Sequence, residues 1–368
     1  LYSLGYLAFK AGRFDEAVQH YSRLVERYGQ DPLAAKAQYG IGDAYYNAGR
    51  MEEAAAAYQR VLERYPSSPF AAEAAASLDN VLTETGQAGR AREVLDRFTQ
   101  SAPPEIGEAL RYRQAETAFA RGDYQSARLA LTPLARSARS EEVRLDAAFL
   151  LADIAVAEGR TEEAAEGYRR VSNAEGYAHR AEAARRLGDV LLGANDARTA
   201  LEAYRRAESL ADGDERITTA ARIGQARALL VLNQAADAEA LVAPLAATDA
   251  TAALVLGRIQ EATGRTDAAV ASYRRAATDE TVVGAEATGR LGALLLTRGD
   301  AAGALAAVQG AETRFEGFDA ELAQALLVRA RALRALNRTA DARTAYLDVE
   351  TRFPGTEAAR TAAQERGQ

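Results

Sequence analysis

The sequence predicts an all-α solenoid built from about ten helical hairpins. The prediction depends first on a pattern that occurs ten times, in which a Gly or an Asn is followed five residues later by an Ala. Successive copies lie 31 to 38 residues apart. The ten turn residues are Gly12, Gly49, Gly86, Gly122, Gly159, Asn195, Asn233, Gly264, Gly299 and Asn337. A period of this length is typical of stacked units that bury their apolar faces against their neighbours.

The composition is the second observation, and it favours packed helices over strands. The chain has 368 residues, of which 48% are hydrophobic and only 7% aromatic, and it contains only 8 Pro. Its net charge of −7 favours solubility and argues against a nucleic-acid partner, which usually requires a basic excess. The absence of Cys excludes disulfides and thiolate metal sites. No apolar run approaches the roughly 18 residues that a membrane span needs.

Residues 35–70 show the repeating unit most clearly. The first helix of this unit carries a stripe of apolar and small residues at Ile41, Gly42, Tyr45 and Tyr46. Gly49 follows the helix end, where a left-handed backbone costs Gly little and Asn is the next best residue. A second helix is expected from Met51 to about Arg64. Because the turn between the two helices is so short, they must be antiparallel neighbours.

The ends of the units show similar regularity. Asp31-Pro32 and Ser68-Pro69 each place a capping side chain before a Pro at the expected first helical position. The spacing falls to 31 residues between Asn233 and Gly264. We therefore expect a shortened loop or a lost helical turn in this interval, near residues 248–251.

Small and large residues alternate across the hairpins in a way that predicts interlocked packing. Opposite the Ala of each second helix, the first helix usually carries a small residue, at Gly5, Gly42, Ala115, Ala152, Gly188, Ala226, Gly257, Gly292 and Ala330, with Asp79 as the exception. Four residues after the Ala comes a larger residue that we expect to fill the seam: Tyr21, Tyr58, Leu95, Leu131, Tyr168, Tyr204, Val242, Tyr273, Val308 and Tyr346.

This arrangement resembles the tetratricopeptide repeat, in which a small residue, a turn Gly, an Ala and an aromatic residue follow one another at these spacings. Pro66, Pro103 and Pro354 match the Pro of that repeat, whereas its early Trp is missing. The resemblance covers residues 1–368, which we expect to form a single right-handed α-solenoid of about ten such helix-turn-helix repeats. Residues 356–368 are expected to be a capping helix or the start of an eleventh repeat.

The resemblance implies that first helices line a concave groove and that second helices face outward. We define the groove positions as the residues that follow each small first-helix residue: Tyr6, Asp43, Asn80, Glu116, Asp153, Asp189, Arg227, Arg258, Ala293 and Arg331. With residues one turn away, the candidate peptide-binding residues are Tyr39, Asp43, Tyr46, Asn80, Tyr112, Glu116, Phe119, Phe149, Asp153, Asp189, Arg227, Arg258, Arg331 and Arg334.

These candidates give the two halves of the groove different chemistry. The aromatic, acidic first half suits basic or aromatic side chains, and the arginine-bearing second half suits carboxylates. The alternative is that the charges are merely solvated and that the aromatic residues pack between repeats.

Residues that would point to an enzyme or a metal site are lacking. His20 and His179 lie in different repeats without His or Cys companions, and no nucleophile elbow or Ser-His-Asp order occurs. Paired carboxylates such as Glu52-Glu53 fall in first helical turns, where they complement the helix dipole. We therefore expect no catalytic residues, no metal and no cofactor.

The expected function is a non-enzymatic scaffold that binds a protein or peptide segment in its groove. The runs at residues 65–74 and 353–359 resemble the inter-repeat segments of bacterial envelope members of this family, such as the Tol–Pal-associated and barrel-assembly lipoprotein repeats. The periplasm is therefore the expected compartment, with the cytoplasm as the alternative. Because the sequence begins at Leu1 rather than Met, we expect that it was trimmed from a longer chain. The alternative function is a regulatory or oligomerisation module of a larger protein, and the oligomeric state stays open.

Overall fold

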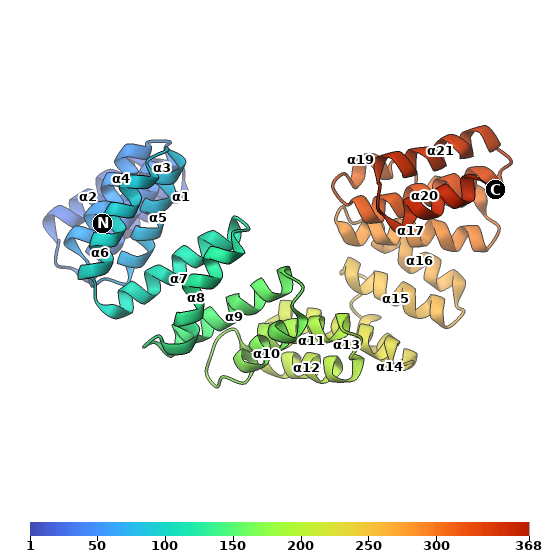
Figure 1. Cartoon of the computed structure of the whole chain (residues 1–368), viewed down its shortest axis with the longest axis horizontal. Coiled ribbons are helices and arrows are strands. Elements are labelled where there is room, and N and C mark those ends of the chain that lie inside the picture. Colours follow the sequence, from blue (N-terminus) through green and yellow to red (C-terminus); the bar gives the residue numbers. More distant parts are fainter. Residues whose placement is uncertain (368) are drawn as a thin grey trace. The chain divides into compact units, whose positions relative to one another are not determined.

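The computed structural model describes residues 1–367, except for the side chains of Arg92, Gln100 and Ser101, and every regular element in that part of the chain is a helix. The chain divides into two compact units, Leu1–His179 and Arg180–Gln368. Within each unit, helices that follow one another in the sequence pack as antiparallel pairs, as Figure 1 shows. The sequence predicted one continuous solenoid over residues 1–368, and this stays a prediction.

The first unit, residues 1–179, contains five hairpins. Its first helices are α1 (Tyr2–Lys10), α3 (Pro32–Asn47), α5 (Phe70–Glu84), α7 (Pro104–Ala120) and α9 (Glu141–Ala157). Its second helices are α2 (Phe14–Arg27), α4 (Met51–Arg64), α6 (Ala88–Ser101), α8 (Tyr124–Ser137) and α10 (Thr161–Ser172).

The second unit, described over residues 180–367, also contains five hairpins, and one further helix follows them. The first helices are α11 (Arg180–Gly193), α13 (Glu215–Val231), α15 (Ala250–Ala262), α17 (Val282–Thr297) and α20 (Asp319–Ala335). The second helices are α12 (Ala197–Leu210), α14 (Ala235–Val242), α16 (Thr266–Ala276), the broken pair α18 (Ala301–Ala307) and α19 (Ala311–Arg314), and α21 (Thr339–Arg352). The segment 356–368 contains α22 (Glu357–Arg366), which packs on α20 and α21, whereas Gln368 lies outside the described residues.

All ten turn residues adopt the left-handed backbone that the sequence predicted. Their φ angles run from 60° at Asn233 to 79° at Gly299. The turn closes with two backbone hydrogen bonds: in the second repeat, the Gly49 amide donates to the Tyr46 carbonyl and the Arg50 amide donates to the Tyr45 carbonyl. The same pair of bonds recurs at every turn and defines a Schellman motif, which satisfies carbonyls at the end of each first helix.

The large seam residues are all buried, as predicted, and the small residues make room for them. A Cβ added at Gly42 would lie only 2.3 Å from the ring of Tyr58. Tyr204 is enclosed from two sides, because added Cβ atoms at Gly188 and Gly224 would both lie within 2.6 Å of its ring. The small residue of the first helix thus accommodates the aromatic ring of the second helix, as well as facing its Ala.

Two second helices are short, and both carry Val instead of Tyr at the seam position. Helix α14 ends at Val242, two residues before Pro244, which disfavours helical backbone at the residue before it. This lost length explains the short spacing that the sequence shows between Asn233 and Gly264. Helix α18 stops before Gly310, whose left-handed φ of 75° separates α18 from α19.

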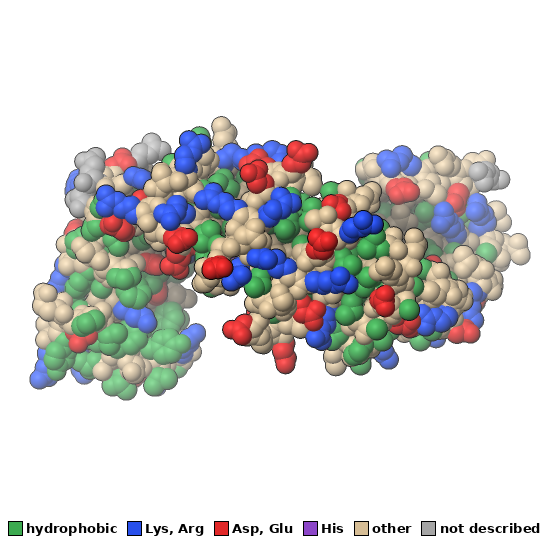
Figure 2. Space-filling model, turned by 90° about the horizontal axis from the view of Figure 1, so that it is seen from below, with side chains coloured by type: hydrophobic (Ala, Val, Ile, Leu, Met, Phe, Trp, Pro, Cys, Tyr) green, Lys and Arg blue, Asp and Glu red, His purple; other side chains and the backbone are tan. Residues whose placement is uncertain are grey.

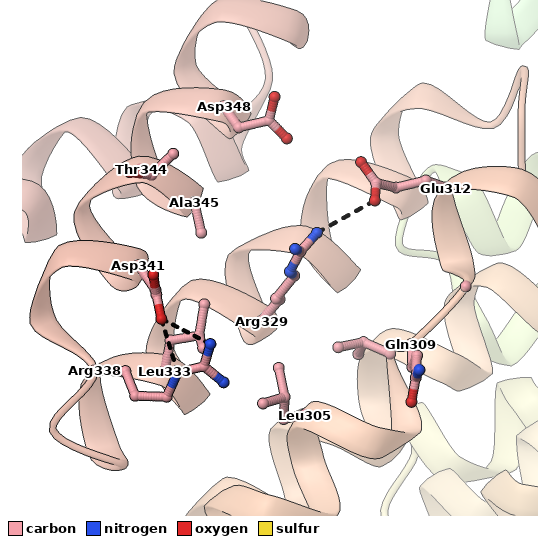
Figure 3. A pocket seen from close by; sticks show the side chains of 12 residues that line it. Leu305, Gln309, Glu312, Arg329, Leu333, Arg338, Asp341, Thr344, Ala345 and Asp348 are labelled. Carbon is pink, nitrogen blue, oxygen red and sulfur yellow. Dashed lines mark hydrogen bonds and ion pairs between the residues drawn. The ribbon is translucent and has the colours of Figure 1, made fainter.

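The break between α18 and α19 opens the largest described hollow of the second unit, about 690 Å³. Figure 3 shows that Leu305, Leu333 and Ala345 point into this hollow, while the ion pairs Arg329–Glu312 and Arg338–Asp341 lie along its sides. The charged side chains around the hollow therefore have partners within the chain.

Arginines on second helices link consecutive repeats at the helix ends. Each one donates to a carbonyl at the end of the preceding second helix, as in the bonds from Arg170 to Ala135 at 2.9 Å and from Arg314 to Ala277 at 2.6 Å. A cation at this place satisfies an otherwise free carbonyl and complements the helix dipole.

The predicted helix starts are correct at one place and shifted at the other. The Asp31 carboxylate accepts a hydrogen bond from the Leu33 amide at 2.8 Å, with Pro32 as the first residue of α3. Helix α5 begins at Phe70, one residue later than predicted, so Pro69 lies in the capping position. The Ser68 hydroxyl nevertheless accepts from the Phe70 amide at 3.2 Å.

The close contact between Gly42 and Tyr58 predicts a steric effect on stability. We expect Gly42→Ala to lower the free energy of unfolding by about 1–3 kcal/mol, because the new methyl group would overlap the buried ring. Gly107→Ala is the matched control: an added Cβ there meets nothing within 4 Å, and alanine should stabilise the helix by about 0.5–1 kcal/mol. Urea unfolding followed by circular dichroism measures both changes, and equal effects of the two substitutions would contradict this account.

The left-handed turns predict a residue preference that does not depend on contacts. At Asn337, where φ is 61°, Asn337→Val should destabilise the protein by about 1–2 kcal/mol, while Asn337→Gly should leave its stability unchanged or higher. Thermal unfolding of the two variants beside the wild type tests this, and a Val variant as stable as the Gly variant would refute it.

Candidate functional site

The first helices of successive repeats contact one another directly within each unit. The contacts run from α1 through α3, α5 and α7 to α9 in the first unit, and from α11 through α13, α15, α17 and α20 to α22 in the second. Each unit therefore has a face made only of first helices, and the groove positions belong to these helices.

Three candidate residues of the first unit meet around one hollow on this face. Asp43 and Tyr46 of α3, Asn80 of α5 and Thr117 of α7 line a hollow of about 300 Å³. The Asn80 amide donates to Glu84 at 2.9 Å, and the Tyr46 hydroxyl donates to the same carboxylate at 3.3 Å. Polar side chains from three successive repeats thus converge on a site that no single repeat could form.

The other aromatic candidates are partly buried against neighbouring side chains. The ring of Tyr39 lies 5.4 Å from that of Tyr58, and its hydroxyl lies 3.2 Å from the Ser77 hydroxyl. Phe119 contacts Tyr124, and Phe149 contacts Tyr168, with ring centroids 5.6 and 5.7 Å apart. These contacts fit the alternative that the sequence left open, in which aromatic residues pack between and within repeats.

Tyr112 and Glu116 complete the candidates on α7. Burial raises the pKa of the Tyr112 phenol, and the nearby Glu116 carboxylate raises it further. Glu116 itself accepts a hydrogen bond from Arg113 at 2.7 Å. Sequence reasoning missed Arg113, which also lies 3.7 Å from Glu73 of α5 and so joins two first helices.

Three groove carboxylates accept a hydrogen bond from a seam tyrosine of their own repeat. Tyr58 donates to Asp43 at 2.8 Å, Tyr204 donates to Asp189 at 2.7 Å, and the pair formed by Tyr168 and Asp153 has the same geometry. In each pair the two residues lie 15 positions apart. An Asp followed 15 residues later by a seam Tyr is therefore the sequence signal that could have identified these bonds.

These bonds determine the electrostatics of the acidic groove positions. Burial raises the pKa of Asp43, and the hydroxyls of Tyr58 and Tyr39 lower it in part. The pKa of the Tyr58 phenol is raised, first by its burial and then by the charge of Asp43. Asp43 and Asp153 are only partly exposed, so they are components of the repeat as well as of its surface.

The candidate arginines of the last repeat are neutralised within the chain. Arg331 and Arg334 both form ion pairs with Glu365 of α22, at 2.6 and 3.4 Å. The Tyr346 hydroxyl donates to Glu365 as well, at 2.9 Å. Because Arg331 occupies the place that Asp holds in other repeats, α22 supplies the carboxylate that the seam tyrosine needs.

The remaining candidates of the second unit differ in their partners. Asp189 of α11 forms an ion pair with Arg185 at 2.5 Å. Arg227 of α13 and Arg258 of α15 form no hydrogen bond and no ion pair with any residue that the structure describes. Arg290 of α17, which sequence reasoning missed, lies close enough to Arg258 to affect its pKa.

Within residues 1–367, no three His, Cys, Asp or Glu side chains are grouped so that they could hold a metal ion. None of the described helices is both long and apolar enough to cross a membrane. On the face seen in Figure 2, basic and acidic side chains are interspersed. The specific chemistry of the first-helix faces therefore lies in local groups, such as the hollow beside Asp43.

The pair of Asp43 and Tyr58 predicts an effect that depends on pH. Because the pKa of Asp43 is raised in the folded state, its contribution to stability is present below the unfolded pKa of about 4 and is lost as the pH rises through the folded pKa. The free energy of unfolding of Asp43→Asn should therefore gain on that of the wild type between pH of about 4 and 7. Urea titrations at several pH values measure this difference.

Tyr58→Phe is the matched variant, since it leaves the carboxylate without its donor. It should cost about 1–2 kcal/mol at neutral pH and raise the pKa of Asp43 further, which carbon NMR of the carboxyl group can follow. An unchanged Asp43 pKa in Tyr58→Phe would show that the hydrogen bond does not form in solution.

Comparisons with known proteins follow from this geometry. Tetratricopeptide repeat models match residues 2–69, 254–317 and 324–356, and a tetratricopeptide repeat-like domain model matches residues 70–227. A comparison with curated protein sequences gives no significant match.

Several solved structures are similar in fold at low sequence identity. Yeast Tom70 is 12% identical, with a TM-score of 0.45 over 100% of this chain and 94% of that one. The apo quorum sensor NprR from B. thuringiensis is 12% identical, with a TM-score of 0.48 over 77% of this chain and 93% of that one. The type IV pilus biogenesis factor PilW is 17% identical, with a TM-score of 0.43 over 70% of this chain and 98% of that one.

The family models follow one another along nearly the whole chain, and their units coincide with the helical hairpins. The chain therefore belongs to the tetratricopeptide repeat family and is a protein-interaction scaffold of that type.

Proposed function

We propose that this scaffold binds an extended segment of a partner protein in a concave groove along its first helices, and that it does so without catalysis in the bacterial cell envelope. The hollow lined by Asp43, Tyr46, Asn80 and Thr117 is the observation that supports this proposal. A segment lying across α3, α5 and α7 would cross the repeats, so its backbone and side chains would meet polar groups from each of them.

The chemistry of this hollow indicates what it would recognise in the partner. Asn80 offers both an amide donor and a carbonyl acceptor, which suits the backbone of an extended peptide. Arg121 already donates to the Asn80 oxygen at 2.8 Å, and this bond holds the amide in one orientation. The Asp43 and Glu84 carboxylates beside it favour a donor or a basic side chain.

The proposed location depends on the resemblance of the inter-repeat segments. The Tyr-Pro-Ser-Ser-Pro run that joins α4 to α5 has the style of envelope repeats, as does the Phe-Pro-Gly-Thr run that joins α21 to α22. Both runs leave the preceding helix through an aromatic residue, Tyr65 and Phe353, whose φ angles are −132° and −123°.

A pull-down from separated envelope and cytosolic extracts of the source organism tests both parts of the proposal. Asn80→Arg would place a long cation across the hollow, and we expect it to reduce capture of the partner about tenfold or more. Leu129→Arg is the matched control, because Leu129 is 71% exposed on the second helix α8.

The expected result is a protein captured from the envelope extract by the wild type and by Leu129→Arg, but not by Asn80→Arg. Equal capture by Asn80→Arg would refute binding in the groove. Capture from the cytosolic extract alone would refute the location and leave the groove intact.

A further inference from the structure

Arg258 of α15 is the unusual cation of the second unit. Its side chain is partly buried, yet it forms no hydrogen bond and no ion pair with any residue in the described part of the chain. Burial lowers the pKa of Arg258, and the nearby charges of Arg290 and Arg227 lower it further, with Glu286 acting in the opposite direction. A partly desolvated, uncompensated cation has an energetic cost that an incoming anion would relieve.

The neighbours of Arg258 extend the cation across three first helices. Arg227 lies on α13 and has no ion-pair partner among the described residues, while Arg290 lies on α17. Arg290 uses its Nε atom to bind Glu286 at 2.6 Å, and no contact of its two terminal nitrogens is recorded in the described chain. Glu261, the other carboxylate near Arg290, accepts the hydroxyl of Tyr273.

A hollow of about 490 Å³ adjoins this cluster on the same face. Arg290 and Glu286 form part of its wall, and its floor includes Gly289 and Ala293 of α17 and Val328 of α20. A volume of this size lies within the range of about 300–1,000 Å³ that ligand sites occupy. Arg331 also lines the hollow, but Glu365 neutralises it, so the free positive charge lies at the Arg258 side.

The hollow exists because α17 and α20 pack directly against each other. An added Cβ at Gly292 would lie 2.7 Å from Val328, and the seam residue between these helices is the small Val308. Ala293 takes the groove position of this repeat, where other repeats carry a charged side chain. Small residues at both places leave space on the groove face of α17.

We propose that Arg227, Arg258 and Arg290, with the adjoining hollow over Gly289, Ala293 and Val328, bind an acidic residue that neighbours a large apolar side chain in an extended protein segment. The guanidinium groups take the carboxylate through charge-assisted, forked hydrogen bonds. The apolar neighbour fills the hollow and removes its floor from water. This inference rests on the proposed groove function and names the ligand chemistry of its second-unit part.

Selection from a displayed library of random peptides tests the inference with the whole chain as target. Peptides of roughly 12 residues are suitable, because in extended form they cross several neighbouring helices. The targets are the wild type, Arg258→Gln, and the matched control Arg274→Gln on the exposed surface of α16. Circular dichroism melting establishes that all three proteins are folded.

We expect the wild type and Arg274→Gln to enrich peptides that carry Asp or Glu beside Leu, Ile, Phe or Tyr, and Arg258→Gln to lose this enrichment. Fluorescence anisotropy then measures one enriched peptide and its Asp→Asn or Glu→Gln counterpart. Loss of the carboxylate should weaken binding to the wild type about tenfold, but should change binding to Arg258→Gln little.

Each other outcome has a defined meaning. Enriched peptides without an acidic residue, or an acidic motif that Arg258→Gln retains, overturn the inference; if Asn80→Arg abolishes binding of those peptides, the proposed groove function survives. If no peptide is enriched by the wild type and the pull-down also shows no dependence on Asn80, both proposals fail together.

Discussion

The packing of the seam tyrosine on small residues is the contact on which the rest of the structure depends. Tyr204 shows this most clearly, because its ring lies between Gly188 of its own repeat and Gly224 of the next one. One side chain therefore joins the two helices of a hairpin and the following first helix. Its hydroxyl, which cannot be left unpaired in the interior, reaches Asp189 at the groove position.

The same contact connects packing to function, because it decides which groove charges are available. Where the seam residue is Tyr and the groove residue is Asp, the carboxylate already accepts a hydrogen bond, as in Asp43 and Asp153. In the last repeat, where the groove residue is Arg331, α22 brings in Glu365 to meet both Arg331 and Tyr346. Arg258 is left without a partner in the described chain, since Tyr273 donates to Glu261 instead.

The two repeats with a Val seam residue show what happens when the ring is absent. A short second helix suffices to cover Val242 or Val308, so α14 and α18 end early. Beside Val308, the first helices α17 and α20 approach until Gly292 meets Val328. The variation from repeat to repeat therefore concentrates space on particular faces, which include the hollows beside Arg290 and Leu305.

The sequence by itself determined the hairpins, because their signals are local. Ten Gly or Asn residues specify left-handed turns, and the buried Ala and seam residues follow at fixed spacings that one hairpin can satisfy alone. Helix lengths were less predictable where Pro244 and Gly310 end the second helices early. The candidate groove residues were correctly assigned to the first helices, since periodicity alone places them there.

The pairing of those groove residues was decided only by the tertiary structure. Glu365 lies 34 positions from Arg331, and Arg113 joins Glu73 across two repeats, so no local pattern reveals that these charges are satisfied. Whether a groove charge is free depends on the partners that neighbouring helices bring to it, and the helix-to-helix approach that sets those distances follows from side-chain volume in the seams. For this reason the sequence could list Arg227, Arg258, Arg331 and Arg334 as equivalent, whereas the structure separates the first two from the last two.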